Sequence, residues 1–244
     1  MSEIDLKTAK KVHFIGIGGI GVSAVAKMML INGRKVSGSD LKQSEITDEL
    51  KSSGAKIFMG HKKENVPEDA DLVVYSPAVP ENNPELAQAR ELGVPILSYP
   101  EVLGVISKEK CTIAVSGTHG KTTTTGMIAK IFIDAGKDPT VIIGSILKDS
   151  GSNFVAGKGK YFVVEACEYK RSFLNMNPTI LVITNIDNDH LDYYKDMADI
   201  QSAFRELALK VPKEGFIVCD AEDERIKPVL EGVSAKIIDY PQLG

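Results

Sequence analysis

The segment that most constrains this chain is a phosphate-loop motif in its middle, Gly117-Thr-His-Gly-Lys-Thr122. An apolar run from Thr112 to Val115 precedes it and predicts a buried strand, and residues of helical composition follow it from Thr122 to Ala135. Glycines let such a turn approach an anion closely, the helix N-terminus points N–H groups at it, and Lys121 adds a positive charge. The Thr122 hydroxyl suits a magnesium ion that bridges phosphates. The motif therefore predicts a nucleotide-phosphate site.

The motif is shorter than the usual G-x-x-x-x-G-K-[ST] pattern, because Val115 stands where that pattern has a glycine. A glycine-rich turn that merely caps a helix is the alternative interpretation. The G-K-T sequence directly after an apolar strand argues against that alternative. We interpret His119 as a spacer within the loop.

The composition is that of a globular protein with room for two domains. The chain has 244 residues, of which 43% are hydrophobic and 25% charged, and its net charge is −4. This charge gives no nucleic-acid footprint, and no apolar run reaches the roughly 18 residues of a membrane span. The N-terminus lacks the apolar core of a signal peptide. Cys111, Cys167 and Cys219 are interpreted as buried thiols, so we expect a cytoplasmic protein; nothing in the sequence sets an oligomeric state.

A second glycine-rich motif lies near the N-terminus. The apolar run Lys11 to Ile15 leads into Gly16-Ile-Gly-Gly-Ile-Gly21, and helical composition follows from Val22 to Ile31. Asp40 lies about 20 residues further on, after the predicted strand Lys35 to Ser39. This is the opening of a Rossmann-like domain, in which a diphosphate sits on the helix N-terminus and an acid accepts a sugar hydroxyl.

Strands and helices then alternate, which predicts a parallel sheet with ligands at the carboxyl ends of its strands. We expect helices at 45–53 and 84–92, strands at 56–59, 71–75 and 94–97, a linking helix at 99–106 and a polar break at 107–110. Ser76 directly follows a strand, with a proline-initiated turn as the equal alternative. His61 follows another strand, with a surface histidine as the alternative.

The second half continues the alternation after a polar stretch. We expect strands at 139–143, 161–169, 179–184, 216–219 and 236–238, mobile loops at 144–160, helices at 195–210 and 223–230, and no closing element at 241–244. Glu165 and Glu168 stand at a strand end, where a carboxylate can ligate magnesium; solvated charges are the alternative. Asp187, Asp189 and His190 follow the next strand and suggest a second metal site, for which magnesium's preference for oxygen favours the aspartates.

These motifs, in this order, resemble those of the Mur ligase family. The resemblance rests on His13 to Gly21, Gly38 to Asp40, Gly117 to Thr125, Glu165 to Glu168 with Ser172 to Leu174, and Thr184 to Asp192, and it runs from residue 11 to about 240. It implies an α/β fold with a Rossmann-like UDP-sugar-binding domain at 1–107, followed by an incomplete central ATP-binding domain of the P-loop type at 108–244.

The resemblance also implies the site residues. The UDP sugar would lie against Gly16, Ile17, Gly18, Gly19, Ile20 and Gly21, with Asp40, His61 and Ser76 nearby. The ATP phosphates would lie against Gly117, Thr118, His119, Gly120, Lys121, Thr122 and Thr123. Thr122 and Glu165 would hold one Mg²⁺, and His190 a second, which replaces the aspartates favoured above. Lys121, Glu165 and His190 would be catalytic.

The implied reaction is ATP-dependent ligation of L-alanine to the lactyl carboxylate of UDP-N-acetylmuramate through an acyl phosphate, in peptidoglycan precursor synthesis. Lys121 and magnesium would offset the growing negative charge. Cys167 and Tyr169 depart from the family's Glu-Ala-Asp-Glu-Ser pattern. Family members are also nearly twice as long and carry a third domain, so we expect this chain to be a fragment that is inactive alone.

Three other functions compete with this one. A recycling ligase would join a tripeptide to the same UDP-N-acetylmuramate, although its early motif usually lacks a clean G-I-G-G-x-G. A non-catalytic UDP-sugar or nucleotide-binding protein would keep the loops without turnover. An NAD-dependent dehydrogenase would explain the first half only.

Overall fold

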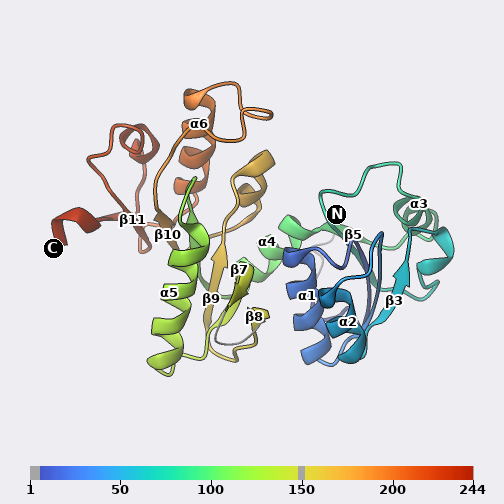
Figure 1. The fold of residues 1–244 in the computed structure, drawn as a ribbon. Coiled ribbons are helices and arrows are strands. Elements are labelled where there is room, and N and C mark those ends of the chain that lie inside the picture. Colours follow the sequence, from blue (N-terminus) through green and yellow to red (C-terminus); the bar gives the residue numbers. More distant parts are fainter. Residues whose placement is uncertain (1–5, 148–151, 244) are drawn as a thin grey trace. The chain divides into compact units, whose positions relative to one another are not determined.

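The computed structural model describes residues 6–147 and 152–243 and has the predicted α/β fold (Figure 1). It divides into two compact units, Met1–Val105 and Ile106–Gly244. Each unit contains its own sheet, which is parallel apart from one strand of the second unit. The division falls inside one helix, and the predicted domain limits, 1–107 and 108–244, stay a prediction.

The first unit is a five-stranded parallel sheet in the order β3-β2-β1-β4-β5, the order of a Rossmann-like fold. Its strands are β1 Lys11–Ile15, β2 Lys35–Asp40, β3 Lys56–Met59, β4 Leu72–Tyr75 and β5 Ile96–Ser98. Its helices are α1 Ile20–Ile31, α2 Glu45–Ser52, the 3₁₀ helix η1 Lys63–Asn65, α3 Pro84–Glu91 and α4 Tyr99–Glu109, which continues into the second unit. The Rossmann-like prediction is confirmed.

Local sequence accounts for the helix starts in this unit. Ser44 and Thr47 form a reciprocal capping box at the start of α2. The Asn83 side chain accepts hydrogen bonds from two N–H groups at the start of α3, where Pro84 occupies a position that needs no donor. Phe14 and Ile15 of β1 are fully buried, as a strand in the middle of a parallel sheet requires.

The second unit is a seven-stranded sheet in the order β12-β11-β10-β6-β9-β7-β8, in which β8 alone pairs antiparallel. Its strands are β6 Cys111–Ser116, β7 Thr140–Leu147, β8 Ser152–Val155, β9 Tyr161–Glu165, β10 Ile180–Ile183, β11 Phe216–Cys219 and β12 Lys236–Asp239. Its helices are α5 Lys121–Asp134, η2 Tyr169–Asn175, α6 Met197–Ala208, η3 Lys227–Leu230 and η4 Tyr240–Leu243.

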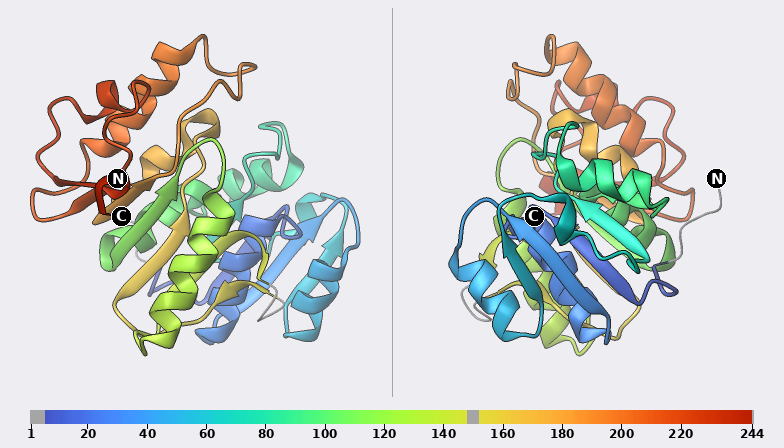
Figure 2. Two further views of the ribbon diagram at one scale, coloured as in Figure 1. Left: turned by 60° about the vertical axis from the view of Figure 1, so that its left-hand side comes forward. Right: turned by 90° about the vertical axis from the view of Figure 1, so that its right-hand side faces the viewer.

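Two apolar contacts hold the helices of this unit in place. Helix α5 runs beside the strands (Figure 2), and its Ala129 packs into a cluster with Ile113 of β6 and Val163 of β9. Helix α6 places the Phe204 ring edge-on to the Phe173 ring, with 5.1 Å between ring centroids. Strand β6 lies between β10 and β9, so the carboxyl ends of all three strands meet at the edge where the phosphate loop begins.

Two predictions about loops and helices in this unit are wrong. The predicted loops at 144–160 contain the end of β7 and all of β8, because Val141 and Ile142 pair with Val155 and Phe154 in a hairpin; residues 148–151 lie outside the described residues. The predicted helix at 223–230 is reduced to turns and η3. Pro228 would lie inside that helix, where its missing N–H and its ring disfavour a full turn.

Three smaller predictions are also wrong. The polar break at 107–110 is mostly helical, since α4 continues to Glu109 through Lys108, and lysine and glutamate are good helix formers. We expected no regular element at 241–244, but residues 240–243 form the 3₁₀ helix η4. Cys219 is fully buried and Cys111 half-buried, but Cys167 is exposed; all three are free thiols.

Candidate functional site

The glycine-rich loop of the first unit connects β1 to α1 and is fastened to β2. The N–H groups of Gly16 and Ile17 donate to the Ser39 carbonyl at 2.9 and 3.0 Å. Gly16 has φ +77°, a conformation that favours glycine. The Gly18 N–H donates to Asp40 Oδ2 at 2.8 Å, and a Cβ on Gly18 would lie 2.9 Å from that oxygen. Asp40 therefore holds the loop in place through this hydrogen bond, which we call the clasp. The sequence did not indicate this role.

The other predicted residues of this unit lie at the same edge of the sheet. His61 follows β3, and its Nδ1 lies 2.9 Å from the Ser39 Oγ of β2. Ser76 follows β4, and a Cβ on Gly16 would lie 3.0 Å from Ser76 Cβ. Because β2, β1 and β4 are neighbouring parallel strands, Asp40, the glycine loop and Ser76 meet where these strands end. The His61 side chain is 13% exposed, so it is not a freely solvated histidine, and its role in binding stays a prediction.

A buried carboxylate supports this edge. Glu85 of α3 is fully buried and accepts hydrogen bonds from His13 Nε2 at 2.9 Å, Ser39 Oγ at 2.7 Å and Asn65 Nδ2 at 2.7 Å. Burial raises the pKa of the Glu85 carboxyl, but these hydrogen bonds outweigh burial and hold the pKa below its ordinary value. No sequence motif pointed to Glu85; only its place in the first turn of a predicted helix was visible.

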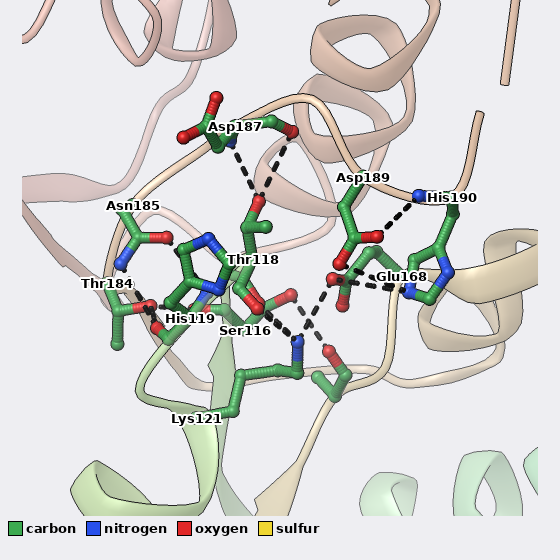
Figure 3. A network of polar contacts seen from close by, with 12 residues as sticks. Ser116, Thr118, His119, Lys121, Glu168, Thr184, Asn185, Asp187, Asp189 and His190 are labelled. Atoms are coloured by element: carbon green, nitrogen blue, oxygen red, sulfur yellow. Dashed lines mark hydrogen bonds and ion pairs between the residues drawn. The ribbon is translucent and has the colours of Figure 1, made fainter.

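The phosphate loop of the second unit is tied to the segment after β10 (Figure 3). The Thr118 Oγ1 accepts the Asp187 N–H at 2.8 Å, and the Asn185 Oδ1 accepts the His119 N–H at 2.9 Å. The Thr184 hydroxyl donates to the His119 carbonyl at 2.6 Å. His119 thus contributes its backbone to the loop, in keeping with its interpretation as a spacer.

Two glycines give the phosphate loop its shape. Gly117 has φ +134°, and a Cβ there would lie 2.1 Å from Thr184 Oγ1. Gly120 has φ +81° and caps the start of α5, so Lys121, Thr122 and Thr123 form the first turn of that helix. The free N–H groups of this turn point toward an anion that approaches the helix N-terminus.

The Lys121 side chain folds back over the loop. Its Nζ contacts the Gly117 carbonyl, lies 3.2 Å from the Thr118 carbonyl and forms an ion pair with Glu168 Oε1 at 3.0 Å. The ammonium group is therefore surrounded by two carbonyl oxygens of the loop and one carboxylate oxygen. Glu168, 2% exposed, is its counter-ion.

Acidic groups cluster beside this lysine (Figure 3). Among the residues that the structure describes, Glu168, Asp189 and His190 each offer a ligand atom, and these atoms lie within 4.8 Å of one another. His190 Nε2 lies 3.9 Å from both Glu168 Oε1 and Asp189 Oδ2. Glu165 ends β9 and is not one of the three.

Carboxylate oxygens without hydrogen-bond partners indicate whether a cation would fit beside Lys121. Among the described residues, the buried side-chain atoms without a hydrogen-bond partner are Glu165 Oε1 and Glu168 Oε2. Glu165 is the last residue of β9 and Glu168 lies three residues beyond it, and buried oxygens of this kind are normally satisfied. A Cβ on Gly144 would lie 2.3 Å from Glu165 Oε2, so only glycine leaves room for that carboxylate. Oxygen donors of this type suit Mg²⁺.

The structure separates residues that looked equivalent in the sequence. Asp189 joins His190 and Glu168, whereas Asp187 forms an ion pair with Arg225 at 2.9 Å. The alternative that Glu165 and Glu168 are both solvated charges is wrong for Glu168, which is buried. In the sequence, Glu168 was indicated only by its position next to the end of a predicted strand.

Aromatic residues complete the surroundings of His190. The Tyr169 ring centroid lies 4.8 Å from that of His190, and the Tyr169 hydroxyl donates to Asp192 at 3.0 Å. The Tyr194 hydroxyl donates to the Glu168 carbonyl, and burial raises the pKa of this phenol. Tyr169, a departure from the family pattern, thus packs against the histidine that the resemblance assigns to a metal.

Across the part of the chain that the structure describes, no helix combines the length and the apolar character that crossing a membrane requires.

Comparison with family models gives two matches in chain order. Residues 11–110 match the Mur ligase family, catalytic domain, and residues 115–242 match the Mur ligase middle domain.

Named relatives extend these matches. A UDP-N-acetylmuramate–L-alanine ligase of Clostridium kluyveri is 50% identical over 232 residues, which are 95% of this chain and 51% of the relative. One of Clostridium tetani is 50% identical over 96% of this chain and 52% of its own length. The chain thus spans about half the length of the curated relatives it matches.

Solved structures agree with the sequence matches. The UDP-N-acetylmuramate-alanine ligase of Thermotoga maritima superposes with TM-score 0.81 at 38% identity, covering 90% of this chain and 51% of that one. The UDP-N-acetylmuramate:L-alanyl-gamma-D-glutamyl-meso-diaminopimelate ligase of Neisseria meningitides gives TM-score 0.86 at 28% identity, covering 94% and 77%. With both halves matched in order, this chain belongs to the Mur ligase family.

Proposed function

We propose that this chain serves the ATP-dependent ligation of L-alanine to UDP-N-acetylmuramate in peptidoglycan precursor synthesis. The observation that carries the proposal is the 50% identity over 95% of the chain to a ligase named for this reaction. In this proposal, residues 1–107 hold the nucleotide sugar and residues 108–244 hold ATP. A cytoplasmic location goes with the use of ATP as donor.

The proposal assigns the second loop to ATP. The N–H groups from Gly117 to Thr123 would line the phosphates, and Lys121 would exchange its contact with Glu168 for phosphate oxygens. ATP supplies the phosphoryl group that turns an unreactive carboxylate into an acyl donor. The Lys121 ammonium would stabilise the negative charge that grows on the phosphate oxygens during this step.

Magnesium would be held by Thr122, Glu165 and His190. The orphaned oxygen of Glu165 and the neighbouring Glu168 and Asp189 support an oxygen-rich cation site. Bound Mg²⁺ would neutralise phosphate charge. Tyr169, packed on the His190 ring, would keep that imidazole in position.

The first loop would hold the UDP sugar at Gly16 to Gly21. Asp40, which clasps the loop through Gly18, would set its shape, and Ser76 and His61 would line the same edge of the sheet.

The test uses a chimaera. In it, this chain replaces the matching 232 residues of the Clostridium kluyveri ligase, and product is measured with ATP, Mg²⁺, UDP-N-acetylmuramate and L-alanine. We expect ATP-dependent alanine ligation and its loss in Lys121→Ala. A chimaera that binds both nucleotides but ligates only a tripeptide would support the recycling reaction, which the fold match to the Neisseria ligase also favours. A chimaera that binds both and ligates neither would contradict the proposal.

A further inference from the structure

The Glu85 carboxylate is a hydrogen-bond acceptor on all sides, and no sequence motif assigns this residue a role. Each of its carboxylate oxygens accepts two hydrogen bonds. Oε1 accepts from Asn65 Nδ2 at 2.7 Å and from the Lys62 N–H at 3.1 Å. Oε2 accepts from Ser39 Oγ at 2.7 Å and from His13 Nε2 at 2.9 Å. These hydrogen bonds favour the ionised form, in which a carboxylate accepts and cannot donate.

The acceptor role of Glu85 determines the hydrogen-bond directions at Ser39 and, through Ser39, at His61. A serine hydroxyl has one proton, and here it is donated to Glu85 Oε2. The Ser39 oxygen must therefore act as the acceptor in its 2.9 Å contact with His61 Nδ1, which places a proton on Nδ1. Glu85 Oε1 lies 3.6 Å from the same nitrogen and favours the proton there electrostatically.

The consequence appears at the other ring nitrogen. In a neutral imidazole with its proton on Nδ1, the Nε2 is an acceptor. The His61 side chain is 13% exposed and follows β3 at the edge that also carries Asp40 and the glycine loop. A histidine beside a diphosphate would ordinarily donate a hydrogen bond to a phosphate oxygen. In this network, the Nε2 of His61 is a hydrogen-bond acceptor instead.

We propose that Glu85 is a positioning residue that acts through Ser39 to fix His61 in its Nδ1–H tautomer, so that His61 Nε2 accepts a hydrogen bond from a ligand hydroxyl or N–H. Sugar hydroxyls and the N–H of a pyrimidine ring carry such donors, whereas phosphate oxygens do not. That the ligand is a UDP sugar rests on the proposed function of the first unit. The tautomer of His61 does not depend on that function.

The test is the ¹⁵N spectrum of the imidazole nitrogens of the whole chain at pH about 8, well above the roughly 6.5 of an unperturbed imidazole. The chain has four histidines, so a His61→Gln variant identifies the His61 signals by their loss. We expect Nδ1 to show the protonated and Nε2 the unprotonated resonance. An Nε2–H tautomer, or an even mixture of the two, in the unsubstituted chain would overturn the proposal whatever the variants do.

Two variants and one control show whether Glu85 causes this state. In Glu85→Gln, the amide oxygen can still accept the hydrogen bond from Asn65, and the NH₂ group then faces Ser39. The Ser39 oxygen would accept from this NH₂ group and its hydroxyl would donate to His61 Nδ1. We therefore expect the His61 tautomer to switch to Nε2–H. Ser39→Ala removes the relay and should give a mixture. Ser37→Ala is the matched control, because Ser37 lies on the same strand but contacts His13 Nδ1 at 2.9 Å. An unchanged His61 tautomer in both folded test variants would contradict the role of Glu85.

Addition of UDP-N-acetylmuramate tests the ligand separately. We expect the His61 Nε2 resonance to move in the direction of an accepted hydrogen bond, and Glu85→Gln to weaken binding by roughly 3–10-fold, as for one lost hydrogen bond. Ser37→Ala should change binding by less than about twofold. Binding without a shift of Nε2 would contradict the acceptor role. No binding by a chain in the Nδ1–H tautomer would count against the proposed function and leave the tautomer assignment standing.

Discussion

The two glycine-rich loops have the same plan, a parallel strand that ends in a tight turn before a helix, but different charges surround them. The first loop has no basic side chain of its own, and a carboxylate, Asp40, accepts its Gly18 N–H at 2.8 Å. The second loop carries Lys121, whose ammonium pairs with Glu168 at 3.0 Å.

This difference shows that a strand–turn–helix motif predicts an anion site but not its ligand. In the first loop the N–H groups of Gly16, Ile17 and Gly18 are already satisfied by Ser39 and Asp40. The negative charge of Asp40 also lies close by, which favours a ligand that offers hydroxyl donors. In the second loop a cation and several acids lie side by side, which favours a polyphosphate with a metal ion.

The largest expected effect is on nucleotide binding by Lys121→Ala. Loss of a charged hydrogen-bond donor to phosphate should weaken ATP binding by roughly 10–150-fold, since such bonds contribute about 1.5–3 kcal/mol. Calorimetry checks this against Lys130→Ala on the same helix, where the exposed lysine pairs with Asp134 and should have little effect. Equal losses in the two variants would show that the loop lysine is not special.

The next effect is on stability and concerns the glycines. Gly117→Ala should lower the free energy of unfolding by about 2–4 kcal/mol, because its φ is +134° and the new methyl group would meet Thr184 Oγ1 at 2.1 Å. Gly16→Ala in the first loop has φ +77° and a looser contact at 3.0 Å, so it should cost less. Gly136→Ala, with φ +66° and no atom within 4 Å, measures the cost of the backbone conformation alone, about 1 kcal/mol. Thermal denaturation that ranked Gly136→Ala as costly as Gly117→Ala would refute the steric explanation.

A smaller effect sharpens the role of Asp40. Asp40→Ala removes the acceptor for the Gly18 N–H and should weaken UDP-N-acetylmuramate binding by roughly 3–10-fold. Asp40→Asn keeps an oxygen that can accept this N–H. If the clasp is what matters, the asparagine variant binds nearly as well as the unsubstituted chain; if the charge contacts the sugar, both variants lose affinity alike.

The smallest expected effect is a pH dependence. The folded pKa of Glu85 lies below its ordinary value of 4.5, so the unfolded chain binds this proton more readily. Glu85 therefore contributes stability above pH 4.5 that is lost as the pH falls through the folded pKa. Urea unfolding of Glu85→Gln should show a shallower loss in acid, but not a flat one, because the pKa of Asp71 is also lowered by hydrogen bonds from the Lys11 and Lys10 N–H groups. Identical acid slopes would contradict this.

Regular elements with strong local signals could be predicted from the sequence. Strands β1, β3 and β11 have the predicted bounds, and both glycine loops lie between a strand and a helix. The hairpin of β7 and β8 was missed because glycine, serine and lysine around it are typical of loops, whereas pairing of Ile142 with Phe154 decides the structure. The helix predicted at 223–230 does not form as a full helix, because Pro228 lacks an N–H group and its ring disfavours a preceding helical turn.

The site was predictable only where residues follow a motif. Lys121 and His190 were found through the loop and the resemblance, and their roles stay predictions. Glu85 could not be found, since its partners His13, Ser39 and Asn65 come from separate segments that only the folded sheet brings together. Asp189 and Asp187 look alike in the sequence, and the ion pair of Asp187 with Arg225 distinguishes them.

The most direct test of the contrast between the loops is calorimetric titration of this chain with UDP-N-acetylmuramate and, separately, with ATP and Mg²⁺, in the unsubstituted protein, Asp40→Ala and Lys121→Ala, with NAD as the control. We predict that Asp40→Ala weakens only the sugar nucleotide, that Lys121→Ala weakens only ATP, and that NAD does not bind. Tight binding of NAD, or loss of both ligands in either folded variant, would contradict the assignment of one ligand to each loop.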